Sequence, residues 1–134
     1  MIKYLLDTNT VIYTMKNRPQ QMRSKFKQHQ GQMAISTVSL GELIFGAEHS
    51  EQVERNLSDI EAMVARLEVL AFDSRAAYHF GQIRSALFKK GQAIGPYDMM
   101  IAGHARACGI VLVTSNLKEF ERVPGLLLEN WVET

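Results

Sequence analysis

The sequence lacks several features that would assign it to a common class of protein. It contains a single cysteine, Cys108, so no disulfide can form within the chain. It has no run of about 18 apolar residues, the length that a membrane-spanning helix needs. The first residues also lack the charged head, apolar run and small-residue cleavage site of a signal peptide. We therefore expect a cytoplasmic protein with no membrane segment.

Three signatures of catalysis are missing as well. The chain has no glycine-rich loop that would cradle phosphates, and no GxSxG turn that would present a nucleophilic serine. Its histidines, His29, His49, His79 and His104, do not show the paired spacing of zinc ligands, and Cys108 stands alone. These absences argue against a P-loop enzyme, a serine hydrolase and a zinc enzyme.

What is present is an ordinary globular composition, with 46% apolar and 22% charged residues in a chain of 134. This length suits one domain, residues 1–134, with its own core. The net charge of +1 conceals a segregation of charge along the chain. Residues 1–41 carry six basic side chains against one acid, Asp7, whereas residues 42–73 carry eight acids against two arginines. The basic segment is suited to a phosphate backbone, although a solvated helix face would also explain it.

Apolar residues follow strand-like and helix-like periods in turn along the chain. We predict strands at 2–6, 33–36, 68–72, 110–114 and 126–131. We predict helices at 8–16, 19–29 (with Pro19 in its first turn), after Ser36 and Thr37, and at 51–67, 74–90 and 96–108. Alternating strands and helices favour a three-layer α/β domain with a mainly parallel sheet. In such domains, sites lie at the carboxyl ends of the strands.

Four acidic residues stand at junctions between these predicted elements. Asp7 ends the first strand, Glu42 comes soon after the second, and Glu119 follows the buried strand "IVLVT". Asp98 lies in the first turn of the helix that Pro96 opens. Three of these junctions would lie on the same edge of a parallel sheet, so we expect the acids to cluster there.

Each acid also has an ordinary explanation. Asp7 could simply cap the helix that follows it. Glu42 could complete a capping box with Ser39, unless Ser36 or Thr37 caps the helix earlier and leaves Glu42 one turn inside it. A negative charge at the position of Asp98 is favoured by the helix dipole, and Glu119 could belong to a surface loop. Taken together, however, the four positions are better explained by a common site.

Three or four carboxylates at one edge cannot all stay ionised without a cation that offsets their repulsion. Oxygen ligands alone suit Mg²⁺ or Mn²⁺, with water and a substrate phosphate in the remaining coordination positions. We therefore expect a magnesium or manganese site.

The ordered motifs resemble a known family. The stretches "LLDTN", "SLGEL", "IGPYDMMIAGHA" and "IVLVTSNLKEFERVPGL" are similar, in order and spacing, to those of PIN-domain ribonucleases. They most closely resemble the VapC toxins of type II VapBC toxin–antitoxin pairs. The resemblance covers essentially the whole chain, and it implies the PIN fold, in which helices flank a parallel sheet that carries an acidic metal site.

The resemblance also implies roles for individual residues. Asp7, Glu42 and Asp98 match the three principal metal-site acids of the family. Many relatives place an aspartate where this chain has Asn116, and Glu119 follows three residues later, so either residue could complete the site. Other polar residues match positions that orient the acids or contact substrate: Thr8, Asn9 and Ser115.

The function implied is that of a toxin. Such enzymes hydrolyse RNA with a divalent cation that activates water, which leaves 5′-phosphate and 3′-hydroxyl ends. The subgroup most resembled cuts initiator tRNA in its anticodon loop and so inhibits translation. The basic residues 16–27 would hold the flanking phosphates. The resemblance further implies a homodimer, and a VapB-type antitoxin whose tail occupies an apolar groove and brings a basic side chain near the acids.

A different class of protein shares much of this pattern. A receiver-like signalling domain has the same length, a parallel α/β sheet and acids that bind Mg²⁺ at strand ends, and its phosphoacceptor here would be Asp73, after "EVLAF". Such domains want two adjacent acids after the first strand and a lysine after a late one. In this chain Thr8 follows Asp7, and "VLVTSN" offers no lysine. We therefore hold the receiver as the alternative to a ribonuclease.

Overall fold

The computed structural model describes residues 1–132, which contain a five-stranded sheet in the order β3-β2-β1-β4-β5. All four strand pairs are parallel. The strands are β1 (Tyr4–Leu6), β2 (Met33–Ser36), β3 (Glu68–Leu70), β4 (Val111–Val113) and β5 (Leu128–Glu129). From β1 the chain adds β2 and β3 on one side of the sheet, and then β4 and β5 on the other side. The strand order therefore reverses between β1 and β4, and open α/β sheets bind ligands at such a reversal point.

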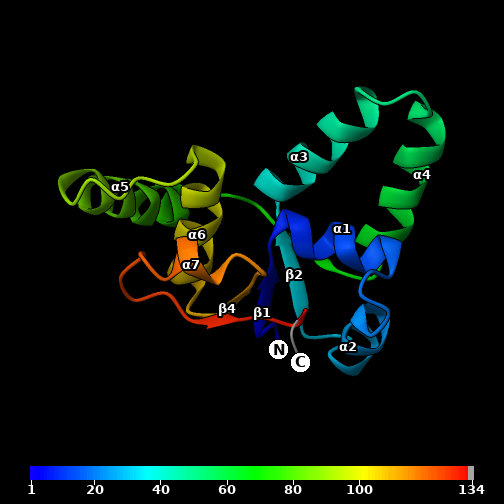
Figure 1. Ribbon diagram of the computed structural model, residues 1–134, viewed down its shortest axis with the longest axis horizontal. Coiled ribbons are helices and arrows are strands. Elements are labelled where there is room, and N and C mark those ends of the chain that lie inside the picture. The colour runs from blue at the N-terminus through cyan, green and yellow to red at the C-terminus, as the bar shows by residue number, and fades with distance from the viewer. Residues whose placement is uncertain (133–134) are drawn as a thin grey trace.

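Helices cover both faces of this sheet (Figure 1). They are α1 (Thr8–Lys16), α2 (Met22–Gln28), α3 (Thr37–Glu48), α4 (Val53–Val64), α5 (Ser74–Lys89), α6 (Pro96–Cys108) and α7 (Leu117–Phe120). Helices α5 and α6 lie on one side, and α1 to α4 lie on the other, where α3 and α4 form a hairpin. The predicted three-layer α/β/α architecture is confirmed. Within residues 1–132, no helix has both the length and the apolar character that crossing a membrane requires.

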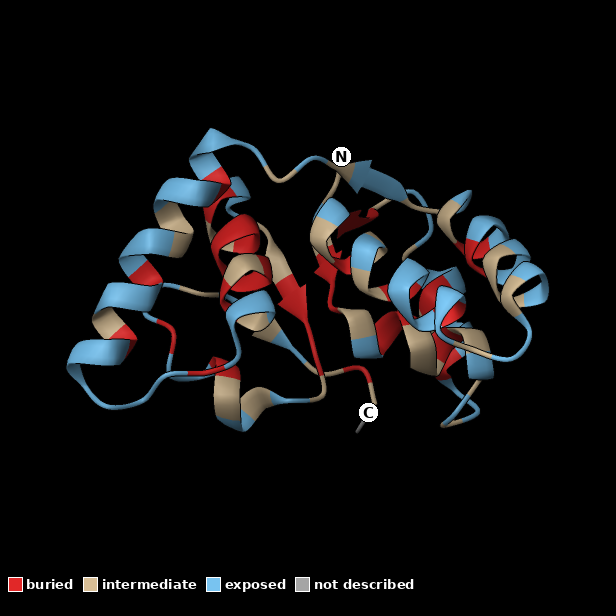
Figure 2. Ribbon diagram, turned by 90° about the horizontal axis from the view of Figure 1, so that it is seen from above, coloured by how far each residue is buried: buried red, intermediate tan, exposed pale blue. Residues whose placement is uncertain are grey.

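Two apolar cores lie on opposite faces of the sheet, because successive strand residues point in opposite directions. Leu5 and Leu112 face α5 and α6, whereas Leu6 and Val113 face α1 to α4. Figure 2 shows buried residues along the central strands and on the helix faces turned toward them, whereas the edge strand β3 is mostly exposed. The central strands are therefore apolar on both faces, and a polar residue at the end of such a strand stands out.

The predicted elements are present, and three details differ. Helix α2 begins at Met22, because Pro19 lies in the turn before it, where its carbonyl accepts a hydrogen bond from the Met22 amide at 3.0 Å. The strand predicted at 126–131 extends only over β5. The segment after β4, expected to be a turn or loop, contains the short helix α7, which is anchored by the buried ring of Phe120.

Candidate functional site

Asp7 stands at the carboxyl end of β1, in the middle of the sheet, and is only 4% exposed. Its Oδ1 atom accepts a hydrogen bond from the Thr10 amide at 2.8 Å, so Asp7 does cap α1. The Thr114 hydroxyl, at the end of β4, also donates to the carboxylate. Burial raises the pKa of Asp7 above its usual value, while the hydrogen bonds from Thr114 and Thr10 act in the opposite direction.

Glu42 lies in the second turn of α3 and reaches back toward α1. The Thr8 hydroxyl donates to Glu42 Oε1 at 2.6 Å, so the first residue of α1 orients this carboxylate. Ser36 caps α3, because its Oγ atom accepts from the Val38 amide at 3.1 Å. The capping box considered for Ser39 and Glu42 is therefore not formed, and the buried Ser39 hydroxyl has no hydrogen-bond partner among residues 1–132. Glu42 lies inside the helix and its carboxylate is not used as a cap.

Asp98 is the third residue of α6, which begins at Pro96 after the capping position Gly95. Burial, together with the negative charges of Glu119, Asp7 and Glu42 in decreasing order of effect, raises the pKa of Asp98 to about 6. This interaction is the clearest sign that the four predicted acids, which come from four separate segments, converge on one place.

Glu119 belongs to α7 and is paired with Asn116, the residue just before that helix. The Asn116 side-chain amide donates to the Glu119 carboxylate. The Asn116 backbone amide donates to Thr114 Oγ1 at 3.0 Å, and Thr114 in turn donates to Asp7. Asn116 and Glu119 therefore lie together, and the Asn116 amide holds the Glu119 carboxylate.

The remaining predicted polar residues lie farther out. Asn9 is exposed and Ser115 is half-buried, and within residues 1–132 neither side chain bonds to the four acids. Two residues that were not predicted as site residues, Thr10 and Thr114, do contact Asp7. The signal for Thr10 is its spacing, because the amide three residues after a capping aspartate is the one that such a cap accepts.

The donor set suits a hard divalent cation. It consists of carboxylate oxygens, which Mg²⁺ and Mn²⁺ prefer. In the described part of the chain, no three His, Cys, Asp or Glu side chains form a ready-made metal cage. Mg²⁺ keeps several of its waters and binds through one or two carboxylates together with substrate phosphate. These carboxylates interact electrostatically but do not form a complete set of ligands. Such an arrangement suits an ion that keeps part of its water shell.

A groove of about 940 Å³ extends from this cluster between the α1–α2 and α3–α4 pairs. Glu42 lines it together with three residues of the basic segment, Lys16, Arg23 and Lys27. The Arg23 guanidinium also donates to the Met15 carbonyl at 3.0 Å, which fixes it at the wall. The predicted basic segment and one of the predicted acids, Glu42, therefore line the same groove.

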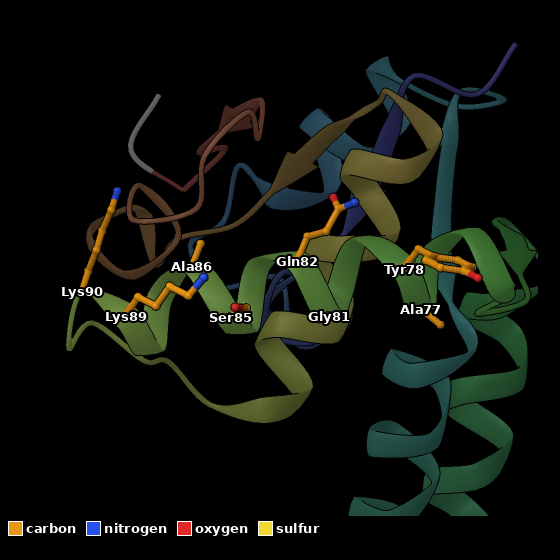
Figure 3. A pocket seen from close by; sticks show the side chains of 8 residues that line it. All are labelled: Ala77, Tyr78, Gly81, Gln82, Ser85, Ala86, Lys89 and Lys90. Atoms are coloured by element: carbon orange, nitrogen blue, oxygen red, sulfur yellow. The ribbon is translucent and has the colours of Figure 1, made fainter.

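A second hollow, of about 770 Å³, lies on the outer face of α5 (Figure 3). Its lining runs along the helix from Tyr78 at one end to Lys90 at the other. None of its lining residues is acidic, and none belongs to the cluster around Asp98. The groove at Glu42 is therefore the candidate site.

The sequence pattern of the PIN domain matches residues 4–126. This chain belongs to the PIN-domain family. It is 53% identical over 131 residues to the tRNA(fMet)-specific endonuclease VapC of Salmonella typhimurium, which covers 98% of this chain and 99% of that protein. It is 49% identical over 132 residues to ribonuclease VapC2 of Haemophilus influenzae, which covers 98% and 100%. The VapC resemblance seen in the motifs is thereby confirmed.

Solved structures agree with this assignment. The DNA-bound VapBC structure from Salmonella typhimurium superposes with a TM-score of 0.94 at 53% identity, over 98% of this chain and 99% of that one. The VapBC-1 structure from nontypeable Haemophilus influenzae superposes with a TM-score of 0.89 at 37% identity, over 99% and 100%. Membership of the PIN-domain family rules out the receiver alternative. Asp73 is the cap of α5, accepting from the Ala76 amide at 3.0 Å, beyond the edge strand β3.

We predict that Asp98→Asn stabilises the metal-free protein at alkaline pH. Because the folded pKa of Asp98 is about 6, the folded chain binds more protons than the unfolded chain between about pH 4 and 6. The stability that protonated Asp98 provides is present below that window and is lost as pH rises through 6. Urea unfolding in EDTA should show a gain of about 1–3 kcal/mol at pH 8 that disappears near pH 4.

Glu61→Gln is the control for this prediction, because Glu61 is an exposed acid on α4. It should show no comparable pH-dependent gain. A loss of stability in Asp98→Asn at pH 8 would mean that the acids do not repel one another.

Proposed function

We propose that this chain is the toxin ribonuclease of a VapBC-type pair, and that it hydrolyses RNA at the acid cluster with the help of Mg²⁺ or Mn²⁺. The convergence of Glu119, Asp7 and Glu42 on Asp98, at the reversal point of the sheet, carries the proposal. The names of the relatives support it, since they are a tRNA(fMet)-specific endonuclease and a ribonuclease.

In the proposed mechanism, Asp7 and Asp98 would hold the cation together with Glu42. The cation, when bound, would lower the pKa of a water molecule and offset the charge that develops on the phosphate. The protein's own part is to hold the carboxylates in place. Thr10 and Thr114 fix Asp7, Thr8 fixes Glu42, and Asn116 fixes Glu119, each through a hydrogen bond from a neutral donor. Such donors orient the acids and leave their charge available to the cation.

The nucleophile in this mechanism is water, and no RNA hydroxyl takes its place. Water gives up a proton as it attacks the phosphorus, the bond from phosphorus to the 3′ oxygen breaks, and that oxygen takes up a proton. The products therefore carry a 5′-phosphate and a 3′-hydroxyl.

We propose initiator tRNA, cut in its anticodon loop, as the substrate. The Salmonella relative named for tRNA(fMet) matches this chain over nearly its whole length. An anticodon loop offers unpaired nucleotides that can enter a groove, whereas the bases of a helical stem are stacked and paired. Lys16 and Lys27 are exposed on the groove that leads to Glu42, where they can neutralise the phosphates flanking the cut.

Asp7→Asn should lower RNA cleavage by about 100-fold or more while leaving the fold intact. Asparagine caps a helix as well as aspartate does, so the amide of Thr10 keeps its partner while the site loses a charge. The measurement is incubation of antitoxin-free protein with total bacterial RNA, in Mg²⁺ or EDTA, with cut sites and end groups mapped by sequencing. We expect cutting in one tRNA loop that EDTA abolishes.

The matched control is Asp73→Asn, because Asp73 also caps a helix at a strand end but lies at the sheet edge. This variant should keep full activity. Products that end in a 2′,3′-cyclic phosphate would contradict the hydrolytic mechanism. Equal losses in the two variants would mean that the charge of Asp7 has no special role in cleavage.

We propose that the same groove receives the tail of a VapB-type antitoxin. Its wall is apolar where α3 and α4 contribute Leu43, Ile60 and Met63, and it ends at the acidic Glu42. An amphipathic segment would lay its apolar side on these residues and bring a basic side chain to the acids. Two relatives of this fold were solved as VapBC assemblies, which supports an antitoxin as the partner.

Gly46→Leu should weaken binding of the antitoxin by about tenfold or more, which corresponds to about 1.4 kcal/mol. Gly46 lines the groove on α3, and no atom lies within 4 Å of the position of an added Cβ, so the new side chain fills the groove without straining the fold. Calorimetric titration with purified antitoxin measures the change.

Gly41→Leu is the control, since Gly41 is on the same helix with equal space but does not line the groove. It should bind the antitoxin normally. If both variants bind equally well, the antitoxin tail lies elsewhere.

A further inference from the structure

A buried hydrogen bond joins two helices that carry acids of the site. His104, on α6, is 2% exposed, and its Nδ1 atom lies 2.8 Å from Ser36 Oγ. Ser36 is fully buried, ends β2 and caps α3 by accepting from the Val38 amide at 3.1 Å. One hydroxyl group therefore connects the sheet, the start of α3 and the middle of α6.

The surroundings of His104 favour a hydrogen bond to Ser36 that does not depend on the protonation of the ring. Burial lowers the pKa of His104, so the ring is neutral at pH 7. The Ser36 hydroxyl can donate to Nδ1 or accept from it while it also accepts from Val38, so either tautomer makes the bond. Phe72 packs edge-on against the imidazole, with ring centroids 5.7 Å apart, and its amide donates to Thr37 Oγ1 at 3.0 Å. The start of α3 is therefore held by two contacts near His104, one at Ser36 and one at Thr37.

The two helices need such a link because their acids repel. Glu42 on α3 is one of the charges that raise the pKa of Asp98 on α6. The buried apolar residues of α3, Leu43 and Ala47, belong to one core, whereas those of α6 belong to the core on the other face of the sheet. Figure 1 shows α3 and α6 standing on either side of the sheet. Val38 in the first turn of α3 packs against the core of α6, but the rest of the apolar face of α3 lies in the other layer. The bond between His104 and Ser36 joins the two helices directly.

We propose that His104 is a positioning residue, whose bond to Ser36 holds α3 against α6 and so keeps Glu42 and Asp98 where one hydrated divalent cation can interact with both. The inference rests on the proposed function of the site. Without the bond, repulsion separates the two carboxylates and the affinity for the cation falls. A high concentration of the cation draws them together again, so turnover at saturation changes little.

Three substitutions separate this role from simple stabilisation. His104→Leu keeps an apolar side chain and removes the bond. His104→Asn places an amide close to the position of Nδ1 and can restore the bond. Ser36→Ala leaves the ring in place and removes both the bond to His104 and the cap of α3, so it serves as a second variant if His104→Leu does not fold.

Ser50→Ala is the matched control at the other end of α3. The Ser50 hydroxyl donates to the Ala47 carbonyl at 2.6 Å and accepts from Asn56 Nδ2 at 2.8 Å. Its loss removes two hydrogen bonds at the α3–α4 connection and leaves the link to α6 untouched.

The test measures Mn²⁺ affinity by calorimetry on the metal-free, antitoxin-free full chain, together with the Mg²⁺ dependence of RNA cleavage. We expect His104→Leu and Ser36→Ala to raise the Kd for Mn²⁺ by about tenfold, the size of effect seen when residues supporting metal ligands are removed. His104→Asn should recover most of the affinity, and Ser50→Ala should match wild type. At saturating Mg²⁺, kcat should stay within about twofold of wild type in every variant.

Wild-type affinity in His104→Leu, or no recovery in His104→Asn, would overturn the inference alone. So would a variant that binds Mn²⁺ normally and loses kcat. If the wild-type chain binds no Mn²⁺, the proposed function fails and the inference fails with it.

Discussion

Repulsion among carboxylates is the constraint on which this structure depends. Four segments of a small domain bring Asp7, Glu42, Asp98 and Glu119 near one another, and burial together with the charges of the other three raises the pKa of Asp98 to about 6. Each hydrogen bond that the described residues make to these acids comes from a neutral group, a hydroxyl or an amide. The acids are thus held in place without being neutralised. A cation bound between the acids offsets their mutual repulsion, which otherwise destabilises the folded state.

The same geometry explains why capping and site chemistry coincide. Helices α1, α3 and α7 begin where β1, β2 and β4 end, so their free amides and the positive ends of their dipoles lie along the carboxyl edge of the sheet. One oxygen of Asp7 satisfies such an amide while its carboxylate stays within range of Asp98. Positive helix ends also favour a phosphate backbone entering from the groove. An aspartate here is a cap and a site residue together.

The sequence predicted the features that depend on a periodic apolar pattern or on a single distinctive residue. Apolar periodicity with Pro96 and Gly109 predicted α6 from end to end, and the alternation of strands and helices predicted the layers. The motifs also pointed to the four acids whose charges interact at Asp98, while leaving open whether Asn116 or Glu119 completes the site. Helix α7 was missed because four residues with one buried ring, Phe120, carry no period. The pairing of Asn116 with Glu119 depends on side-chain rotamers, and the bond from His104 to Ser36 joins residues 68 positions apart. Such contacts depend on tertiary packing, so the local sequence pattern cannot predict them.

Calorimetric titration of Mg²⁺ into the antitoxin-free protein, in two buffers of different ionisation enthalpy, tests the central claim most directly. Because the pKa of Asp98 is about 6, the carboxyl is half protonated at that pH, and binding of a cation must displace the proton. We predict the release of about half a proton per Mg²⁺ bound at pH 6, falling to almost none at pH 8. Binding at pH 6 without release of a proton, or no binding at either pH, would contradict the account.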